Sequence, residues 1–287
     1  MYPVPFEYHR AGSVDEAVAL LGRFGESAKL VAGGHSLLPL MKLRLAEPRH
    51  LVDIRRIPGL SGVREEGGAL IIGAATPHQL LERSPLVRQR IPMLSEAAAQ
   101  IGDAQVRNMG TIGGSLAHAD PAADLPAVML ALGAELVAVG PKGRRALPVD
   151  RFFVKLFTTT LAPGELLTEI RVPLPPAGWG GAYAKFPHPA SRYAVVGVAA
   201  CLTVSARKIT EARVAITGMA AKAVRASATE AALVGQDAEA AVVAAAAERA
   251  VEGLTVRSDP RMDPSYWRAL AVTYTRRALT TALERAG

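Results

Sequence analysis

The first sixty residues alternate between helical and extended patterns of apolar side chains. Residues 13–24 carry apolar positions at helical spacing, and Ser13 with Glu16 three positions later forms a capping box that starts a helix. Short apolar runs at 29–32 and 50–54 predict strands on either side of a further apolar stretch. This order of elements predicts a small α/β unit.

The next part of the chain mixes strands with helices. Strands are predicted over residues 69–73, 135–139 and 165–172, and helices over residues 76–81, 94–101 and 125–132. Thr76 followed by Pro77 predicts a helix in which the threonine is the N-cap. Pro39, in contrast, argues against a regular helix through the middle of residues 36–45.

Prolines and glycines crowd residues 173–181, and this stretch is predicted to separate two domains. Beyond it, strands are expected over residues 182–186, 194–204 and 214–220, and alanine-rich helices over residues 224–233, 238–251 and 265–284. An antiparallel sheet followed by helices is typical of an α+β unit. We therefore predict one domain over 1–176, with subdomains at about 1–56 and 57–176, and a second over 177–287.

Composition narrows the classes of protein. Half of the 287 residues are apolar and 21% are charged, as expected of a packed globular chain. No apolar run reaches the ~18 residues that span a bilayer, and no secretory signal is recognisable, so a cytoplasmic location is predicted. The single cysteine, Cys201, excludes an internal disulfide and a four-thiolate iron–sulfur cluster, and its apolar surroundings predict a buried, unreactive thiol.

The net charge of +7 is spread along the chain. Basic pairs such as Arg55-Arg56 and Arg276-Arg277 are far apart, and no helix-turn-helix or zinc-finger spacing is present. Nucleic-acid binding is therefore not predicted. An anionic ligand or an acidic protein partner accounts for the same charge.

Two glycine turns carry the strongest functional signal: Ala32-Gly33-Gly34-His35-Ser36, the first turn, and Thr111-Ile112-Gly113-Gly114-Ser115, the second turn. Adjacent glycines let backbone N–H groups approach an anion, and the hydroxyl side chains add donors. One such turn is most often an ordinary tight turn, but a pair could hold a diphosphate from two sides. Neither turn fits the Rossmann or P-loop pattern. The pair predicts a dinucleotide ligand.

The segment after the second turn allows two interpretations. His118, Asp120 and Asp124 would be the ligands of a metal ion, but their spacing matches no standard site, and no metal site is predicted in the chain. Asp124 is either the N-cap of a helix or an acceptor for ribose hydroxyls.

Three further side chains are candidates for a functional role, and each also has an ordinary structural explanation. His35 is predicted to orient the backbone of its turn or to be merely exposed, rather than to be catalytic. Lys185 and Tyr193 could reach a ligand across the domain boundary, where binding sites are common. Taken alone, they would instead be a surface lysine and a strand tyrosine.

Residues 31–39 (VAGGHSLLP) and 107–115 (RNMGTIGGS) resemble the FAD-binding medium subunit of molybdenum hydroxylases, the family of aerobic carbon monoxide dehydrogenase and xanthine dehydrogenase. The similarity extends over essentially the whole chain. It implies an α+β protein, with a two-subdomain FAD-binding fold of the vanillyl-alcohol-oxidase (PCMH) type followed by a small α+β domain of the carbon monoxide dehydrogenase flavoprotein type.

In that family the two turns hold the FAD diphosphate. Carried over to this chain, the resemblance assigns cofactor contacts to Val31, Ala32, Gly33, Gly34, His35, Ser36, Leu37, Ile101, Thr111, Ile112, Gly113, Gly114, Ser115, Asp124, Leu161, Lys185 and Tyr193. Asp124 would hold the adenosine ribose, with Ile101 against the adenine. Leu161, Lys185 and Tyr193 would lie near the isoalloxazine, where a lysine favours negative charge on the ring.

The resemblance also implies an electron relay. A large partner subunit would oxidise the substrate at a molybdopterin cofactor, and a small partner subunit with two [2Fe–2S] clusters would pass the electrons to FAD. Reduced FAD would deliver them to an external acceptor. The single cysteine agrees, because this chain cannot ligate the clusters. The implied assembly is an (αβγ)2 heterohexamer, and peripheral membrane association is left open.

Two departures bear on the substrate. Ser115 stands where an asparagine is usual, and residues 186–193 lack the basic Gly-Asp stretch of carbon monoxide oxidising members. Both resemble aldehyde or N-heterocycle (xanthine-type) dehydrogenases, so carbon monoxide is one candidate among several. A non-redox assembly subunit of the same fold and a self-sufficient flavoprotein oxidase are the alternatives from other classes.

Overall fold

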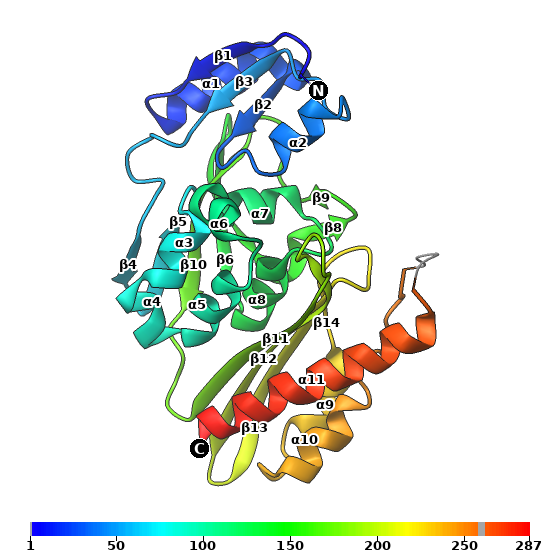
Figure 1. Cartoon of the computed structure of the whole chain (residues 1–287). Helices are drawn as coiled ribbons and strands as arrows, with labels where there is room; N and C mark the ends of the chain where they lie inside the picture. The colour runs from blue at the N-terminus through cyan, green and yellow to red at the C-terminus, as the bar shows by residue number, and fades with distance from the viewer. Residues whose placement is uncertain (1, 258–261) are drawn as a thin grey trace.

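The computed structural model describes residues 2–257 and 262–287. The chain forms three successive units, which lie one below another in Figure 1 from the blue amino-terminal end to the yellow and red carboxyl-terminal end. The helices are α1 Val14–Phe24, α2 Leu37–Lys42, α3 His78–Arg83, α4 Pro85–Arg90, α5 Pro92–Ala99, α6 Ala104–Met109, α7 Ile112–His118, α8 Asp124–Leu132, α9 Ser227–Leu233, α10 Ala240–Ala247 and α11 Pro264–Ala286.

The strands form four sheets. The strands are β1 Glu7–Arg10, β2 Ala28–Val31, β3 His50–Asp53, β4 Val63–Glu66, β5 Ala69–Gly73, β6 Glu135–Gly140, β7 Gly143–Pro148, β8 Phe153–Lys155, β9 Thr158–Thr159, β10 Leu166–Pro173, β11 Trp179–Pro187, β12 Ala194–Ser205, β13 Lys208–Thr217 and β14 Val224–Arg225. The sheet orders are β1-β3-β2, β4-β5-β10-β6-β7, β11-β12-β13-β14 and β8-β9.

The first unit is a parallel three-stranded sheet packed on α1. The Ser13 hydroxyl accepts the Glu16 N–H, which confirms the predicted helix start. The prediction for Pro39 was wrong, because α2 runs through it. Pro39 is the third residue of α2, where a backbone N–H needs no partner within the helix, so its missing N–H costs nothing.

The second unit is a five-stranded antiparallel sheet accompanied by α3 to α8, and it holds the largest apolar core. The predicted N-cap role of Thr76 was wrong: its hydroxyl accepts the Gly62 N–H and donates to the Gly62 carbonyl, and α3 begins without a side-chain cap. Helix α6, capped by Asp103, stands between α5 and the second turn and was not predicted.

The third unit is an antiparallel sheet with a helix layer on each face. Ala199 and Cys201 of β12 pack into the core that contains α8, whereas the alternate residues Val198 and Ala200 pack into the core that contains α11. In Figure 1, α11 crosses this sheet as the long red helix. The predicted burial of Cys201 is confirmed, and burial raises the pKa of its thiol to about 12.

Strand β14 occupies Val224–Arg225, where a helix was predicted to begin, and α9 starts only at Ser227. Over the two described stretches of chain, no helix combines the length and the apolar character that crossing a membrane requires.

Candidate functional site

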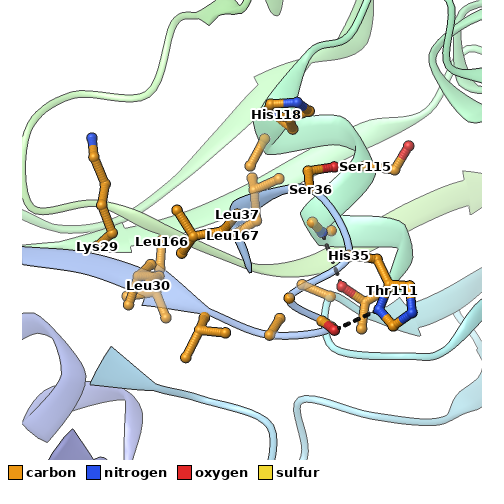
Figure 2. Close-up of a pocket in the computed structure, with 18 of the residues that line it drawn as sticks. Lys29, Leu30, His35, Ser36, Leu37, Thr111, Ser115, His118, Leu166 and Leu167 are labelled. Atoms are coloured by element: carbon orange, nitrogen blue, oxygen red, sulfur yellow. Dashed lines mark hydrogen bonds between the residues drawn. The ribbon is translucent and has the colours of Figure 1, made fainter. Parts of the chain in front are cut away.

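A cleft of about 1030 Å³ opens between the first and second units. This volume lies near the upper end of the range for small-molecule sites, on the order of 300–1,000 Å³. The first turn and α7 form its walls, and the loop between β11 and β12 closes one side with Tyr193. Figure 2 shows His35 and Ser36 of the first turn beside the helix that carries Ser115.

The two glycine turns meet through their backbones. A Cβ built on Gly33 would lie 2.2 Å from the Met109 carbonyl oxygen and 2.7 Å from the Gly110 Cα. Only glycine therefore allows the first turn to pack against the residues that lead into the second turn. This contact brings segments almost eighty residues apart onto one cleft.

The first turn presents a run of unpaired donors. Among the described residues, the backbone N–H groups from Gly33 to Leu37 have no hydrogen-bond partner, and the first N–H to be paired is that of Leu38, which donates to the Gly34 carbonyl. Gly34 has φ +73, which turns successive N–H groups toward one side. His35 Nδ1 donates to the Gly33 carbonyl at 2.9 Å, so this histidine orients the backbone of its turn, as predicted.

The second turn uses its donors internally. The Ile112 and Gly113 N–H groups donate to the Thr76 and Ala74 carbonyls at 3.1 and 2.8 Å. The Gly114 N–H donates to the hydroxyl of Thr111, the N-cap of α7. A Cβ on Gly113 would lie 2.5 Å from the Ala74 carbonyl oxygen, so this glycine serves packing. The second turn thus offers the start of α7 and the Ser115 hydroxyl rather than a row of free amides.

His78 lies against the residues that lead into the second turn, and no sequence motif predicts its role. Its backbone N–H donates to the Gly110 carbonyl at 2.9 Å, and its buried Nδ1 has no hydrogen-bond partner in the described part of the chain. Burial, followed by the charges of His35 and Arg107, lowers the pKa of the His78 imidazole to about 4. A neutral ring therefore lines the cleft behind the turns.

Asp124 is held in a buried cluster with two residues of β11. Lys185 Nζ lies 2.9 Å from the carboxylate and also donates to the Gln100 carbonyl at 3.0 Å, and the Tyr183 hydroxyl donates to Asp124 Oδ1. Burial raises the pKa of the Asp124 carboxyl, and Lys185 and Tyr183 oppose that rise. The N-cap alternative for Asp124 was wrong, because Ala123 occupies the cap and Asp124 is the first helical residue.

The third unit fixes the segment that leads into Asp124. The Thr217 hydroxyl donates to the Pro121 and Ala123 carbonyls at 2.7 and 2.8 Å. The Gly218 N–H donates to the Pro121 carbonyl, and the Ala194 N–H donates to the Ala122 carbonyl. Strands β12 and β13 therefore position one wall of the cleft.

Most of the predicted contact residues line this cleft, and two do not. Ile112 is fully buried in the core. Lys185 lies behind Asp124, with a side chain 1% exposed, and is not among the described residues of the lining. Tyr193 stands on the rim, where burial and Asp120 raise the pKa of its phenol while Ser36 opposes the rise. The assignment of the individual residues to parts of the cofactor remains a prediction.

The residues present fit an elongated anionic ligand with flat rings. The unpaired amides of the first turn suit phosphate oxygens. The apolar side chains of Ile101, Phe157 and Leu161 line the cleft and suit aromatic ring systems. Phe157 and Arg192 both have left-handed backbones, at φ +51 and +60, and such strain in residues other than glycine gathers at functional sites.

Comparisons with known proteins agree with this geometry. The family described as "FAD binding domain in molybdopterin dehydrogenase" matches residues 4–175, and the one described as "CO dehydrogenase flavoprotein C-terminal domain" matches residues 181–282. The carbon monoxide dehydrogenase medium chain of Hydrogenophaga pseudoflava is 46% identical over 285 residues, which is 99% of each chain.

Two further similarities extend the picture. The 6-hydroxypseudooxynicotine dehydrogenase complex subunit alpha of Paenarthrobacter nicotinovorans is 41% identical, over 100% of this chain and 97% of its own length. A solved structure of carbon monoxide dehydrogenase from Hydrogenophaga pseudoflava, which lacks the Mo-pyranopterin moiety of its cofactor, matches with a TM-score of 0.96 at 48% identity, over 99% of each chain.

Proposed function

The chain belongs to the family of FAD-binding medium subunits of molybdenum hydroxylases, and from that premise we propose that the first turn holds the FAD diphosphate. Members of this family are oxidoreductase subunits that carry FAD and work with large molybdenum-binding and small iron–sulfur subunits. The run of unpaired N–H groups from Gly33 to Leu37 is the observation that carries the proposal.

The two turns have different tasks in this proposal. The first turn binds phosphate oxygens through its free amides and the Ser36 hydroxyl. The second turn is a fixed support that adds the Ser115 hydroxyl and the partial positive charge at the start of α7. Asp124 and Ile101 face the adenosine end of the cofactor, whereas Leu161 and Tyr193 face the flavin end.

Lys185 acts through Asp124 in this arrangement. Its ammonium group lies 2.9 Å from the carboxylate, so it holds Asp124 in position for ribose hydroxyls instead of touching the flavin. Lys185 also opposes the rise that burial causes in the pKa of the Asp124 carboxyl, and so favours its charged, accepting form. We therefore infer a positioning role for Lys185.

FAD, when bound, supplies the capacity to accept electrons one at a time and to release them to an external acceptor. The chain itself binds the cofactor, fixes its orientation and excludes water around the apolar rings. The single buried cysteine is consistent with this division of labour, because the clusters need thiolate ligands that this chain lacks. The proposed assembly is a cytoplasmic (αβγ)2 heterohexamer, and peripheral attachment to a membrane is compatible with it.

Carbon monoxide is the first candidate substrate of the holoenzyme. The 46% identity to a carbon monoxide dehydrogenase medium chain supports this candidate. An aldehyde or N-heterocycle is the second candidate, supported by Ser115 in the second turn and by the 41% identity to a 6-hydroxypseudooxynicotine dehydrogenase subunit. Assays of the purified three-subunit enzyme with carbon monoxide, with aldehydes and with N-heterocycles distinguish the two candidates.

The test of the cofactor site is to purify the full chain and to measure how many FAD molecules it binds. We expect flavin absorbance that dithionite bleaches, and we expect ADP to compete with FAD for the apoprotein because both share the diphosphate. A colourless chain that takes up no FAD, even when produced together with its partner subunits, would leave only an assembly role. Turnover of substrate by this chain alone would favour a self-sufficient oxidase.

A further inference from the structure

Three potential metal ligands converge on the first unit, away from the cleft. Glu7 and His9 lie two residues apart on β1, so their side chains point to the same face of the sheet. His50 of β3 is the register partner of Glu7 in the parallel pairing. The side chains therefore meet across two strands whose residues are more than forty positions apart in sequence.

The distances between the three ligand atoms are nearly equal. His9 Nε2 lies 3.1 Å from His50 Nδ1, and one Glu7 carboxylate oxygen lies 3.4 Å from His50 Nδ1 and 3.6 Å from His9 Nε2. Zinc ligands at about 2.0–2.1 Å in tetrahedral geometry are separated by roughly 3.3–3.4 Å. The observed triangle has this size, so an ion could bind all three atoms with only small adjustments.

A hydrogen-bond network explains the triangle less completely. The two histidine nitrogens can share one proton, which accounts for the shortest edge. The two distances to Glu7 exceed the usual hydrogen-bond range of about 2.7–3.2 Å, although the same carboxylate oxygen lies within 3.6 Å of both ring nitrogens. The carboxylate thus sits where a third ligand belongs rather than where a hydrogen-bond acceptor would settle.

The surroundings favour a cation and hold the rings in place. Phe24, the last residue of α1, stacks on His50 with ring centroids 3.8 Å apart and lies 4.8 Å from His9. The C-terminal end of this eleven-residue helix, where the helix dipole is negative, therefore lies close to the two rings. The nearby Arg23 guanidinium lies over the Phe24 ring, 5.1 Å from its centroid.

We propose that Glu7, His9 and His50 form a binding site for a divalent transition-metal ion, with Zn²⁺ as the preferred ion. Two imidazoles and one carboxylate are the ligand set of a zinc site that keeps a fourth position for water. Glu7 is 70% exposed, so this position opens to solvent. The ion ties β1 to β3 and stabilises the first unit. None of the three is among the described residues that line the cleft, so we expect this site to be independent of FAD binding.

The test is titration of the untagged, full-length, chelator-treated chain with Zn²⁺ alone. We expect one equivalent to bind by calorimetry and to raise the melting temperature. Co²⁺ in its place should give the absorption of a tetrahedral ion at wavelengths longer than the flavin bands. Affinity should fall at low pH, because metal-bound imidazoles must be unprotonated.

Variants locate the ion. His9→Ala should weaken Zn²⁺ binding by a hundredfold or more and Glu7→Gln by about tenfold, because each removes one ligand or its charge. Glu47→Gln and His188→Gln change exposed residues of the same types and should leave the affinity unchanged. FAD content serves as the folding check for His9→Ala, Glu7→Gln and Glu47→Gln, in which it should stay at the wild-type level.

Two results would overturn the site. One is a wild-type chain that binds no Zn²⁺ at micromolar concentrations. The other is binding that persists at full affinity in both His9→Ala and Glu7→Gln. Either result would mean that the two histidines form only a hydrogen-bonded pair.

Discussion

The two glycine turns look alike in sequence and differ in how they use their backbones. In the first turn, consecutive N–H groups from Gly33 to Leu37 have no partner among the described residues. In the second turn, the N–H groups of Ile112, Gly113 and Gly114 are all paired within the chain. The first turn is thus built to meet a ligand, and the second is built to stay in place.

This difference shows that neighbouring glycines can be required for unrelated reasons. Gly34 has a backbone conformation, φ +73, that side chains disfavour. Gly33 and Gly113 instead lack room for a Cβ, because carbonyl oxygens of Met109 and Ala74 would lie 2.2 and 2.5 Å away. Gly114 meets only the Thr111 hydroxyl, at 2.8 Å. Substitutions in the two turns should therefore separate cofactor affinity from stability.

Gly33→Ala is expected to have the largest effect. The added methyl group would collide with backbone, which cannot rotate away, so the chain should lose about 3 kcal/mol or more of stability. It should also lose FAD, because the first turn moves off the second. Gly114→Ala should lose less stability, since the only close neighbour of the added methyl group is one side-chain oxygen among the described residues. Urea unfolding measures the stability of the two variants, and flavin absorbance measures their FAD content. Equal losses of stability in the two variants would contradict the packing argument.

The buried imidazole behind the turns predicts a pH dependence. The pKa of His78 falls from 6.5 to about 4 on folding, so between these values the unfolded chain binds a proton that the folded chain does not. Protonation of His78 therefore has no effect on the free energy of unfolding above about pH 6.5. As the pH falls to about 4, it lowers that free energy by roughly 3 kcal/mol.

This contribution is isolated by comparing variants. His78→Gln should lose less stability than the wild type between pH 7 and pH 4.5, whereas His188→Gln, at an exposed loop position, should follow the wild type. Chemical unfolding at a series of pH values gives the comparison. Parallel pH profiles for the wild type and His78→Gln would show that this imidazole is not held neutral.

Thr111→Val tests the second turn as a support. It removes the hydroxyl that accepts the Gly114 N–H at the start of α7, and loss of such a cap costs about 1 kcal/mol. FAD affinity should change little, since the N–H groups of Ile112, Gly113 and Gly114 are already paired within the chain. A large loss of affinity at unchanged stability would mean that the Thr111 hydroxyl binds the cofactor directly.

Ser36→Ala tests the first turn as the ligand-binding side. The Ser36 side chain makes no capping hydrogen bond to α2, so the melting temperature of the apoprotein should stay the same. FAD binding should weaken by about 0.5–1.5 kcal/mol, up to roughly tenfold, for one lost hydrogen bond. Fluorescence titration of the apoprotein with FAD measures the change, and an unaltered dissociation constant would remove Ser36 from the site.

Local patterns predicted most of the elements. Strands β2, β3, β5, β6 and β10 to β12 and helices α1, α5, α8 and α11 all lie where apolar spacing places them, within a few residues. Strand β13 begins at Lys208, six residues before the predicted strand. The polar sequence of β1, Glu-Tyr-His-Arg, carries no strand signal, because its pairing with β3 depends on a distant segment. The N-cap prediction for Thr76 was wrong for a similar reason, because its hydroxyl forms hydrogen bonds with Gly62, fourteen residues away in sequence.

The candidate site was predictable as a set of residues but not as a geometry. The two turns and the resemblance name most of the cleft lining. Sequence cannot show that Lys185 is buried against Asp124, because this contact spans sixty-one residues. It also cannot show that His78 faces the cleft, or that β1 and β3 bring Glu7 to His9 and His50. Such features depend on tertiary packing.

The hydrogen bonds from Thr217, Gly218 and Ala194 to residues 121–123 matter for protein engineering. The carboxyl-terminal domain is not an interchangeable module, although a short proline-rich connector makes it look like one. A chimera spliced within residues 174–178 would bring foreign strands against the segment before Asp124. A useful graft must therefore carry over the hydroxyl of Thr217 and the amine of Lys185 together with the borrowed sheet.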